Sequence, residues 1–514
     1  MVSCSVSVRR WTGVALSFFL PVISITCVYL LTANTLANNG RWDSCKPHLD
    51  RGVMGAVKYC RRWQALARGH LNLGAWHGFQ EVIYKEPLDA GTLSFNFFLD
   101  KDTHVSLVYE KDDKQFSGIR FSLNPLFPSM LFRASSEGEF LDKVPVAASN
   151  LEGGKWNHVD ISVNGNKAIM MLNGIPVTAE GIRWPEKMTL GFRGCDGRVL
   201  IDGIMAYDKN GQVLLKENFS NHKHWLPVSA LTLLLFVFFA GILSLLLKAR
   251  AASLRDILLS VFLFNVVVGV FAALLYFVVF FAQHKYTYLD TSGAPMAGMT
   301  YEESIAAFKN GLETRARLPR EPNTYRILFV GTSQTWGAGV SKERDMFENR
   351  IEARLNSQAE QGRTRYECIT AGVSGSTAAE MLGLYRSEAL QLQPNLVIID
   401  LGNNDTDAQL FRAALNKFID INLQRGIRTL LVLEANSVER TPNELPMHQC
   451  MRDVGRERNV PVVELHEYLK QRHDAGFLWW DYVHLSSFGH KLAADCIEKA
   501  LHEHHLLPEK PENR

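Results

Sequence analysis

The chain has 514 residues, 47% of them hydrophobic, which is long enough for two or three domains with buried cores. Its 55 basic and 53 acidic residues are spread along the sequence and give a formal net charge of +2. The sequence therefore lacks the basic stripe that a polyanion requires, which argues against nucleic acid as a partner.

Three apolar runs divide the sequence, at residues 13–33, 225–247 and 257–282. The second and third runs contain no charged residue, and at about 1.5 Å per residue each helix reaches roughly 35 Å. Because that length crosses a bilayer core, we predict two membrane helices there. Segment 1–37 is a cytoplasmic tail with either a third membrane helix or a signal peptide that ends at the small-residue site 35–37.

Basic residues set the expected orientation of these helices. Lys248, Arg250 and Arg255 lie in the short loop between the second and third runs, and Arg9 and Arg10 precede the first run. Cytoplasmic loops carry an excess of Lys and Arg, so this loop and the N-terminal tail are expected in the cytoplasm. The two large polar segments then face the periplasm or the cell exterior, as in a bacterial inner-membrane protein.

Eight cysteines are thinly spread, and Cys45 and Cys60 flank a short segment that a disulfide can close in an oxidising compartment. The spacing of the cysteines does not suggest zinc. The HEHH cluster at residues 502–505 is either a metal site or a solvated end near a polar tail, and we favour the second interpretation. We expect neither a metal nor a cofactor.

Residues 75–208 have the pattern of an all-β domain. Short runs that partly alternate apolar and polar residues are separated by Gly, Asn, Asp and Pro, with no helical pattern between them. Such spacing favours a two-sheet sandwich. The expected strands are residues 92–99, 105–109, 118–123, 130–134, 156–163, 168–172, 188–192 and 199–207.

Two stretches of this domain resemble concanavalin-like and laminin-G-like jelly rolls. GGKWNHVDISVNGNKAIMMLNG at residues 153–174 is similar to one of their hairpins, and VLIDGIMAYD at residues 199–208 is similar to their final strand. The resemblance implies a jelly-roll sandwich that either binds a glycan or only shapes an assembly. The residues open to both interpretations, as sugar ligands or as core and turn residues, are Trp156, Trp184, Asp196 and Asp202.

A connector at residues 284–323, with an expected helix at 301–317, leads to a second domain at residues 325–508. In this domain unbroken aliphatic runs alternate with amphipathic segments, which indicates a parallel sheet covered on both faces. Functional residues of such sheets gather at the carboxyl ends of the strands. The expected strands are residues 326–330, 366–371, 396–401, 429–433 and 460–465, with helices around 347–355 and 410–423.

The motifs of this second domain point to acyl-group chemistry. GTSQTWG at residues 331–337 places Ser333 in a tight turn after the first strand, where we expect a helix to begin and its N–H groups to bind an oxyanion. The stretch WWDYVHLSSFGH supplies His484 as a base and Asp481, three residues earlier, to orient the imidazole. The stretch LGNNDTD offers Asn404 as a side-chain N–H donor.

Together these stretches resemble the SGNH (GDSL-type) hydrolase family over residues 325–505. The resemblance implies Ser333 as the nucleophile and His484 with Asp481 as the base and its orienter. It also implies an oxyanion hole formed by Ser333, Gly375 of AGVSGST and Asn404.

Two positions depart from the family pattern. Thr332 stands where the family usually has Asp, and Thr370 stands where it usually has Asn, which leaves open how the Gly375 loop is braced. His490 is interpreted as a residue of a helix N-terminus and not as a second base. Three tryptophans either line a substrate cleft or pack in the core, namely Trp336, Trp479 and Trp480.

The sequence thus predicts a multi-domain membrane protein. It combines a doubly wound parallel α/β sheet of the SGNH, flavodoxin-like type with an all-β jelly-roll sandwich and two or three transmembrane helices. We expect a membrane-anchored serine esterase that removes O-acyl groups, in particular O-acetyl, from an extracytoplasmic glycan. A lipid esterase or thioesterase, a glycan O-acyltransferase and a non-catalytic glycan-binding scaffold remain alternatives. The sequence does not indicate the oligomeric state.

Overall fold

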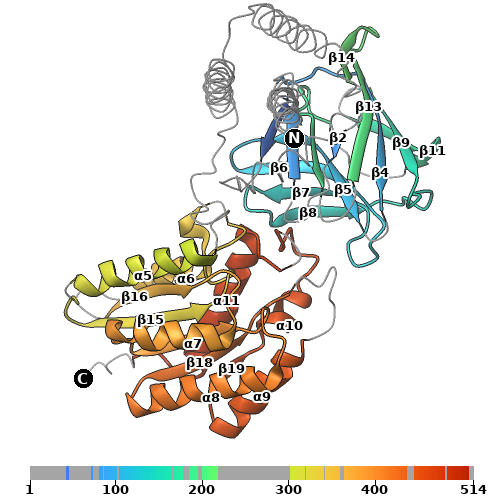
Figure 1. The fold of residues 1–514 in the computed structure, drawn as a ribbon. Helices are drawn as coiled ribbons and strands as arrows, with labels where there is room; N and C mark the ends of the chain where they lie inside the picture. Colours follow the sequence, from blue (N-terminus) through green and yellow to red (C-terminus); the bar gives the residue numbers. More distant parts are fainter. Residues whose placement is uncertain are drawn as a thin grey trace, which may run out of the picture.

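The chain folds into a β-sheet domain followed by an α/β domain in a computed structural model (Figure 1). The structure describes residues 42–45, 71–72, 80–84, 86–100, 103–164, 167–177, 184–194, 199–217, 301–318, 320–340, 342–358, 364–436, 445–480 and 483–508.

The first domain consists of two antiparallel sheets, which we call sheet A and sheet B. In spatial order, sheet A contains β1 (Trp42–Cys45), β3 (Gln80–Tyr84), β12 (Gly191–Gly194), β5 (His104–Lys111), β6 (Gln115–Ser122), β7 (Met130–Ser135) and β8 (Phe140–Pro145). Sheet B contains β11 (Ile175–Val177), β10 (Lys167–Leu172), β9 (Trp156–Asn164), β4 (Thr92–Leu99), β13 (Val199–Tyr207) and β14 (Val213–Glu217), and β2 (Leu71–Asn72) also pairs with β13.

A single hydrophobic core lies between the two sheets, so the domain is a β-sandwich. Strand β4 illustrates why, because alternate side chains of TLSFNFFL are buried and the others lie on the outer face. The expected strands at residues 92–99 and 199–207 coincide with β4 and β13. Sequence patterning missed β1, β2, β3, β8, β11 and β14, and the jelly-roll assignment stays a prediction.

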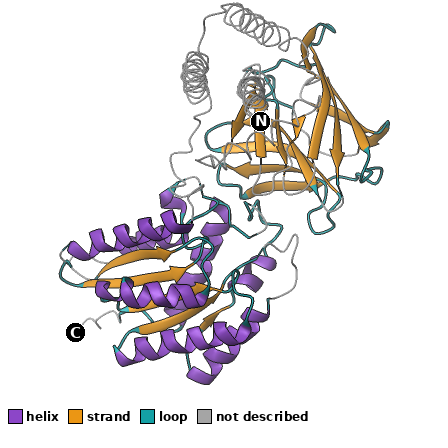
Figure 2. Cartoon of the chain, in the orientation of Figure 1, coloured by secondary structure: helices purple, strands orange, loops and turns teal. Residues whose placement is uncertain are grey.

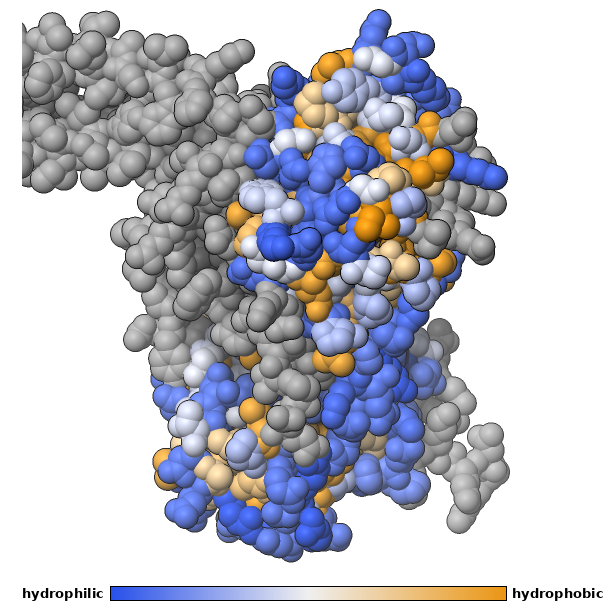
Figure 3. All heavy atoms as spheres, turned by 90° about the vertical axis from the view of Figure 1, so that its right-hand side faces the viewer, coloured by the Kyte–Doolittle hydropathy of each residue, from blue (hydrophilic) through white to orange (hydrophobic). Residues whose placement is uncertain are grey.

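The candidate sugar ligands have different surroundings in the sandwich. Trp184 is 4% exposed and stacks on Tyr109 at 5.0 Å between ring centroids, so it is a core residue. Trp156 is 46% exposed, and its ring centroid lies 6.0 Å from that of Phe98 in an edge-to-face arrangement. Asp202 accepts a hydrogen bond from the N–H of Gly203 at a β-bulge, and Asp196 lies outside the described residues. Figure 3 shows hydrophobic residues interspersed with hydrophilic ones over one face of the sandwich.

The second domain is built on a five-stranded parallel sheet. In spatial order its strands are β16 (Arg365–Gly372), β15 (Thr324–Gly331), β17 (Leu396–Leu401), β18 (Arg428–Leu433) and β19 (Val462–Val463). Numbered along the chain, this is the order 2-1-3-4-5 of flavodoxin-like folds. The chain reverses direction across the sheet between β15 and β17, which creates a switch point at their carboxyl ends.

Helices cover both faces of this sheet (Figure 2). One face carries α5 (Tyr301–Arg317), α7 (Ala378–Ser387), α8 (Ala408–Gln424) and α9 (Pro446–Arg458), and the other carries α6 (Phe347–Gln358), α10 (Leu465–Lys470) and α11 (Ser487–Glu503). Strand β15 contacts both helix layers. Leu328 and Val330 pack against the layer that contains α7 and α8, whereas Ile327 and Phe329 pack against the layer that contains α6 and α11. The predicted doubly wound architecture is therefore confirmed.

No helix among the residues that the structure describes is long and apolar enough to cross a membrane. The predicted spans at residues 13–33, 225–247 and 257–282 lie outside the described residues, as does Cys60.

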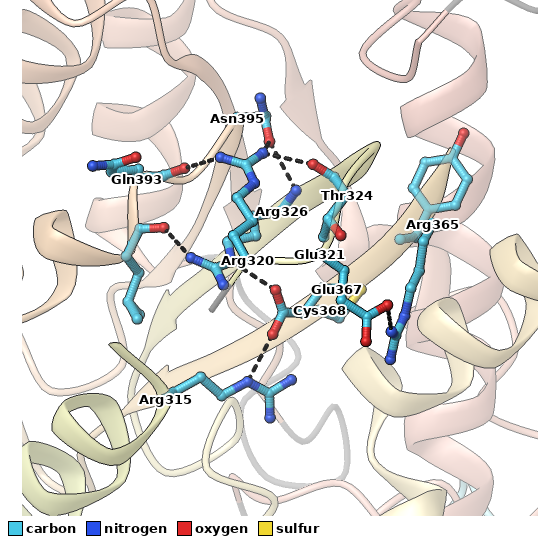
Figure 4. A network of polar contacts seen from close by, with 12 residues as sticks. Arg315, Arg320, Glu321, Thr324, Arg326, Arg365, Glu367, Cys368, Gln393 and Asn395 are labelled. Carbon is cyan, nitrogen blue, oxygen red and sulfur yellow. Dashed lines mark hydrogen bonds and ion pairs between the residues drawn. The ribbon is translucent and has the colours of Figure 1, made fainter. Parts of the chain in front are cut away.

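An ionic network fastens α5 to the amino end of the sheet (Figure 4). The carboxylate of Glu367 on β16 accepts hydrogen bonds from Nε of Arg326, at 2.6 Å, and from Nε of Arg315, at 2.9 Å. The side chain of Arg326 is 8% exposed and that of Glu367 is 19% exposed. Burial raises the pKa of Glu367, but the hydrogen bonds and charges of both arginines outweigh it, so the pKa lies below the ordinary 4.5.

We predict that Glu367→Gln lowers the free energy of unfolding of this domain by roughly 3 kcal/mol at pH 7, because it leaves the guanidinium of Arg326 buried without its counter-charge. Since the folded-state pKa of Glu367 is lowered, its contribution is present above pH 4.5 and is lost as the pH falls through the lowered value. Thermal unfolding measured from pH 7 to pH 3 should therefore show the difference shrinking. Glu321→Gln, which removes the partner of the exposed Arg365, is the control and should leave the midpoint almost unchanged.

Candidate active site

The predicted site residues lie in loops at the carboxyl edge of the parallel sheet. Ser333 follows β15, Gly375 follows β16 and Asn404 follows β17. These three strands are neighbours, with β15 in the centre. The topology therefore places the three loops next to one another at the switch point.

Close packing forces the sharp turn that carries Ser333. A Cβ atom on Gly331 would lie 1.9 Å from Oγ1 of Thr335 and 2.7 Å from the carbonyl oxygen of Asp400, so only glycine fits. After the turn, the N–H of Ala338 donates to the carbonyl oxygen of Ser333 at 2.9 Å. The hydroxyl of Ser333 is consequently held at the sheet edge and is half-buried.

The expectation that a helix begins at Ser333 is wrong. Residues 332–339 form turns, and the next long helix begins only at Phe347. The physical reason is backbone conformation, since Gly337 and Gly339 have φ angles of +88° and +99°, which a right-handed helix excludes. Oxyanion-binding N–H groups here belong to a turn and not to a helix terminus.

His484 and Ser333 meet although they are 151 residues apart. Nε2 of His484 lies 2.8 Å from Oγ of Ser333, which is hydrogen-bond distance. A neutral imidazole with its hydrogen on Nδ1 accepts the serine proton in this geometry. Asp481, the predicted orienter, lies outside the described residues.

The loop that carries His484 closes on itself. The N–H of Trp480 donates to the carbonyl oxygen of His484 at 2.8 Å, and the Trp480 ring lies 5.8 Å from the imidazole. Trp336 and Trp479 are 4% and 2% exposed, so these two tryptophans pack in the interior and do not line an open cleft. Trp480 is the one of the three that adjoins the base.

Gly375 and Asn404 flank the serine from the neighbouring strands. Gly375 is exposed and has a φ of +79°, a conformation that favours glycine. Nδ2 of Asn404 donates to the carbonyl oxygen of Ser376 at 3.0 Å. An amide nitrogen carries two hydrogens, so Asn404 retains one for a second acceptor.

The hydrogen bond from Asn404 is one of the contacts that brace the Gly375 loop, although position 370 is not an asparagine. Besides the Asn404 bond, the N–H of Val373 donates to the carbonyl oxygen of Gly331 at 3.2 Å. Beyond the loop, both carboxylate oxygens of Asp405 lie 3.1 Å from the N–H of Ala378 at the start of α7. The backbone and the Asn404 loop together hold the segment.

Sequence reasoning missed Glu434, which replaces the family's usual aspartate as a support of the serine turn. The hydroxyl of Thr332 donates to Oε1 of Glu434, and the N–H of Asn403 donates to Oε2 at 2.8 Å. The carbonyl oxygen of Ala435, the next residue, accepts hydrogen bonds from Nε2 of Gln334 at 2.5 Å and from Nδ2 of Asn403 at 3.1 Å. The segment after β18 therefore ties the serine turn to the asparagine loop.

Buried acids lie under the site. Burial raises the pKa of Glu434 well above its ordinary value, and the nearby Asp400 carboxyl raises it further. Burial also raises the pKa of Asp400, against a lowering by its hydrogen bond from Thr335. Glu348 is fully buried as well, which raises its pKa too. These directions favour a neutral Glu434.

His490 has a structural position. It is the fourth residue of α11, is fully buried, and stacks on Phe347 at 5.3 Å between ring centroids. Its Nδ1 accepts the N–H of Phe347 at 3.3 Å, and burial lowers the pKa of His490 to about 3. A neutral His490 thus supports the start of α6.

Sequence comparison bears on the same domain. Residues 329–492 match the GDSL-like lipase/acylhydrolase family. This part of the chain is a GDSL-type hydrolase domain. With Ser333 and His484 at hydrogen-bond distance, it is a serine ester hydrolase. No curated protein matches the chain.

Several solved structures are similar to this hydrolase domain. A lipase/acylhydrolase from Enterococcus faecalis is 22% identical over 36% of this chain and 99% of its own, with a TM-score of 0.31. An acetyl xylan esterase is 21% identical over 34% of this chain and 99% of its own, with a TM-score of 0.30. A two-domain esterase active on acetylated mannans is 18% identical over 41% of this chain and 55% of its own, with a TM-score of 0.33.

We predict opposite outcomes for two changes at Glu434. Glutamine mimics the protonated acid, since its oxygen can accept from Asn403 and its amide can donate to the hydroxyl of Thr332, which can rotate to accept, so Glu434→Gln should keep kcat within about threefold. Glu434→Ala removes both contacts and should lower kcat about tenfold or more, because it loosens the serine turn. Esterase kinetics on p-nitrophenyl acetate at pH 6 measure both.

The pH dependence of stability provides the control for Glu434. Its folded-state pKa is raised, so the folded chain keeps a proton that the unfolded chain releases, and stability falls as the pH rises above 4.5. Glu434→Gln should weaken this fall in thermal midpoints between pH 5 and pH 8. A Gln variant as inactive as the Ala variant would show that the ionised carboxylate is required.

Proposed function

We propose that this protein is a membrane-anchored esterase that removes O-acyl groups, chiefly O-acetyl, from an extracytoplasmic glycan. The observation that carries the proposal is the 2.8 Å contact between Nε2 of His484 and Oγ of Ser333 at the carboxyl edge of the sheet. This pair has the geometry of a base and its nucleophile.

In the proposed first half-reaction, Nε2 of His484 takes the hydroxyl proton as Oγ of Ser333 attacks the ester carbonyl carbon. The N–H groups of Ser333 and Gly375 and the free hydrogen of Asn404 Nδ2 stabilise the tetrahedral oxyanion. The bond from the carbonyl carbon to the glycan oxygen then breaks, and that oxygen leaves with the proton from His484. Asp481 is assigned to the Nδ1 side of the imidazole.

In the second half-reaction, His484 takes a proton from water as the water oxygen attacks the acyl-serine carbonyl carbon. The same N–H donors bind the second oxyanion. The bond to Oγ of Ser333 breaks and Oγ recovers its proton from His484. Acetic acid leaves, and the enzyme returns to its starting state.

The composition of the loops around Ser333 supports a polar substrate. Residues 374–376 and 403–407 read Ser-Gly-Ser and Asn-Asn-Asp-Thr-Asp, and most of them are exposed or half-buried. In the described part of the hydrolase domain, the exposed large hydrophobic residues are Leu318, Leu410 and Leu423, and none belongs to a loop that bears a proposed catalytic group. A hydroxylated leaving group such as a glycan suits this rim better than a long acyl chain does.

The sequence supports the proposed location. The apolar runs at residues 225–247 and 257–282 suit membrane helices, and the basic loop between them favours an orientation with both large domains outside the cytoplasm. Glycans are abundant on that side of a bacterial membrane, and the sandwich beside the hydrolase domain is proposed to contribute to their recognition.

We predict that Asn404→Ala lowers kcat on p-nitrophenyl acetate on the order of a hundredfold, because loss of one oxyanion donor costs about 2.7 to 4 kcal/mol of transition-state stabilisation. The value of KM should change little, since the donor acts on charge that develops after binding. Asn416→Ala is a control, because its side chain bonds only to helices away from the site, with Nδ2 donating to the carbonyl oxygen of Arg412 on α8 and Oδ1 accepting from Arg458 on α9. An Asn404 variant that keeps full kcat would remove this residue from the oxyanion hole.

The proposal is tested by acetate release from O-acetylated polysaccharides by the full-length chain, with Ser333→Ala as the matched control. We expect release by the wild-type protein alone, and we expect p-nitrophenyl acetate to be cleaved faster than esters of eight or more carbons. Preference for long acyl esters would instead identify a lipid esterase. Absence of both hydrolysis and phosphonate labelling of Ser333 in a folded protein would refute the esterase mechanism.

A further inference from the structure

The sandwich contacts the hydrolase domain just before the loop that carries His484. The N–H of Phe140 donates to the carbonyl oxygen of Ala475 at 2.9 Å, and the N–H of Phe477 donates to that of Gly138 at 2.8 Å. These bonds pair residues 475–477 with the turn between β7 and β8, which lie on the side of the sandwich toward the hydrolase domain (Figure 1). Gly138, at a φ of +105°, permits the approach, because its Cβ would lie 3.2 Å from Cβ of Phe477.

The ring of Phe477 inserts into an aromatic cluster on the outer face of sheet A. Its centroid lies 5.0 Å from Phe140, 5.3 Å from Phe132 and 5.8 Å from Phe116. Phe477 is 3% exposed. The hydrolase domain thus buries a full aromatic side chain in the other domain.

Two arginines of sheet A also hold this ring. Cζ of Arg193 on β12 lies 4.2 Å from the centroid of Phe477, and Cζ of Arg120 on β6 lies 4.9 Å from it. Arg120 is 2% exposed, so its contact is shielded from water. Shielded cation–π contacts are the stronger ones, at about 2 kcal/mol.

Ion pairs surround the cluster and contribute less. Their side chains are partly exposed, and such pairs typically contribute about 0 to 1 kcal/mol. The pairs between the domains are Lys143 with Asp474 at 2.6 Å, Lys491 with Glu139 at 2.6 Å and Arg350 with Glu137 at 3.1 Å. Phe477 is consequently the principal anchor of the contact.

Phe477 is hydrogen-bonded directly to the loop that carries His484. The hydroxyl of Ser486 donates to the carbonyl oxygen of Phe477, and the N–H of Ser486 donates to that of Leu478 at 2.8 Å. Inside this closure, Trp480 bonds to His484. Phe477 and Ser486 therefore close the two ends of the loop that carries His484. A shift of Phe477 is expected to move this loop.

We propose that Phe477 is a positioning residue through which the sandwich fixes His484 against Ser333. The aromatic and arginine side chains on the outer face of sheet A fix the ring of Phe477. Phe477 in turn fixes the first end of loop 478–486, and this loop carries the imidazole of His484. The inference rests on the ester hydrolysis proposed above and is independent of which ester is the substrate. The sandwich is then part of the catalytic unit.

The test uses the full-length chain with Phe477→Ala and Phe477→Leu. Because misplacing a catalytic group by about 1 Å can cost a hundredfold, we expect Phe477→Ala to lower kcat tenfold to a hundredfold with KM within about threefold. Leucine keeps an apolar anchor and should restore kcat to within about fivefold of the wild type. Rates are expressed per Ser333 that reacts to completion with a fluorophosphonate, so unfolded protein does not count.

A matched pair in the sandwich separates positioning from stability. Phe132→Leu and Phe95→Leu make the same change at two buried phenylalanines, but only Phe132 contacts Phe477, whereas Phe95 packs between the sheets against Phe192. We expect Phe132→Leu to lower kcat and the rate of Ser333 phosphonylation about threefold to tenfold, because it loosens the anchor. Phe95→Leu should leave both rates per active site unchanged.

The outcomes are distinct. Unchanged kcat per active site in Phe477→Ala, or equal losses in Phe95→Leu and Phe132→Leu, would overturn the positioning role. If the wild-type protein neither hydrolyses esters nor reacts with the phosphonate, the proposed function fails. Amide hydrogen exchange of residues 483–486 in Phe477→Ala then decides the inference, since faster exchange supports the anchor and unchanged exchange refutes it.

Discussion

The hydrogen bond between His484 and Ser333 is the interaction on which the rest of the site depends. It joins two loops that are 151 residues apart, and neither loop belongs to a helix or strand. A contact of 2.8 Å between two such segments persists only if each is fixed from its own side, because an unsupported loop samples many conformations. The sheet edge fixes the serine, and the interdomain contact fixes the histidine.

On the serine side, the support differs from the usual family arrangement. Thr332 cannot supply a carboxyl group, but Glu434 supplies one from the end of β18 and binds both the serine turn and the asparagine loop. The carboxyl group thus comes from the end of β18, two strands away from β15 in the sheet, and not from the turn itself. The departure at position 332 is therefore compensated within the site, which weakens the argument that the site has decayed.

The sequence predicted those parts of the structure that depend on local pattern. Strands β4, β13 and β17 and helix α5 coincide with their expected ranges, because apolar periodicity determines them. Two of the elements it missed are poor in aliphatic residues. Strand β8 reads FLDKVP with mostly exposed side chains, and α9 reads PMHQCMRDVGRER with few aliphatic residues. Tertiary packing, not local propensity, stabilises both.

The same limit applies to the site. The motifs selected Ser333, His484, Gly375 and Asn404 as candidates, because each follows a recognisable strand or precedes a helix. They could not locate Glu434, which is 102 residues from Thr332. A buried carboxyl group after a strand has no local signature, since its role depends on the hydrogen-bond partners that the fold brings to it.

The two sheets of the sandwich have different roles, and burial reveals the difference. Side chains of β4 in sheet B alternate between buried and half-buried, as expected for a sheet with one solvated face. Strands β5 and β6 of sheet A are buried on both faces, although β6 reads QFSGIRFS. Arg120 is buried there because the ring of Phe477 covers it. The centre of sheet A, at β5 and β6, is thus a middle layer between the sandwich core and the hydrolase domain, and sheet B, with Trp156, is the layer that faces outward.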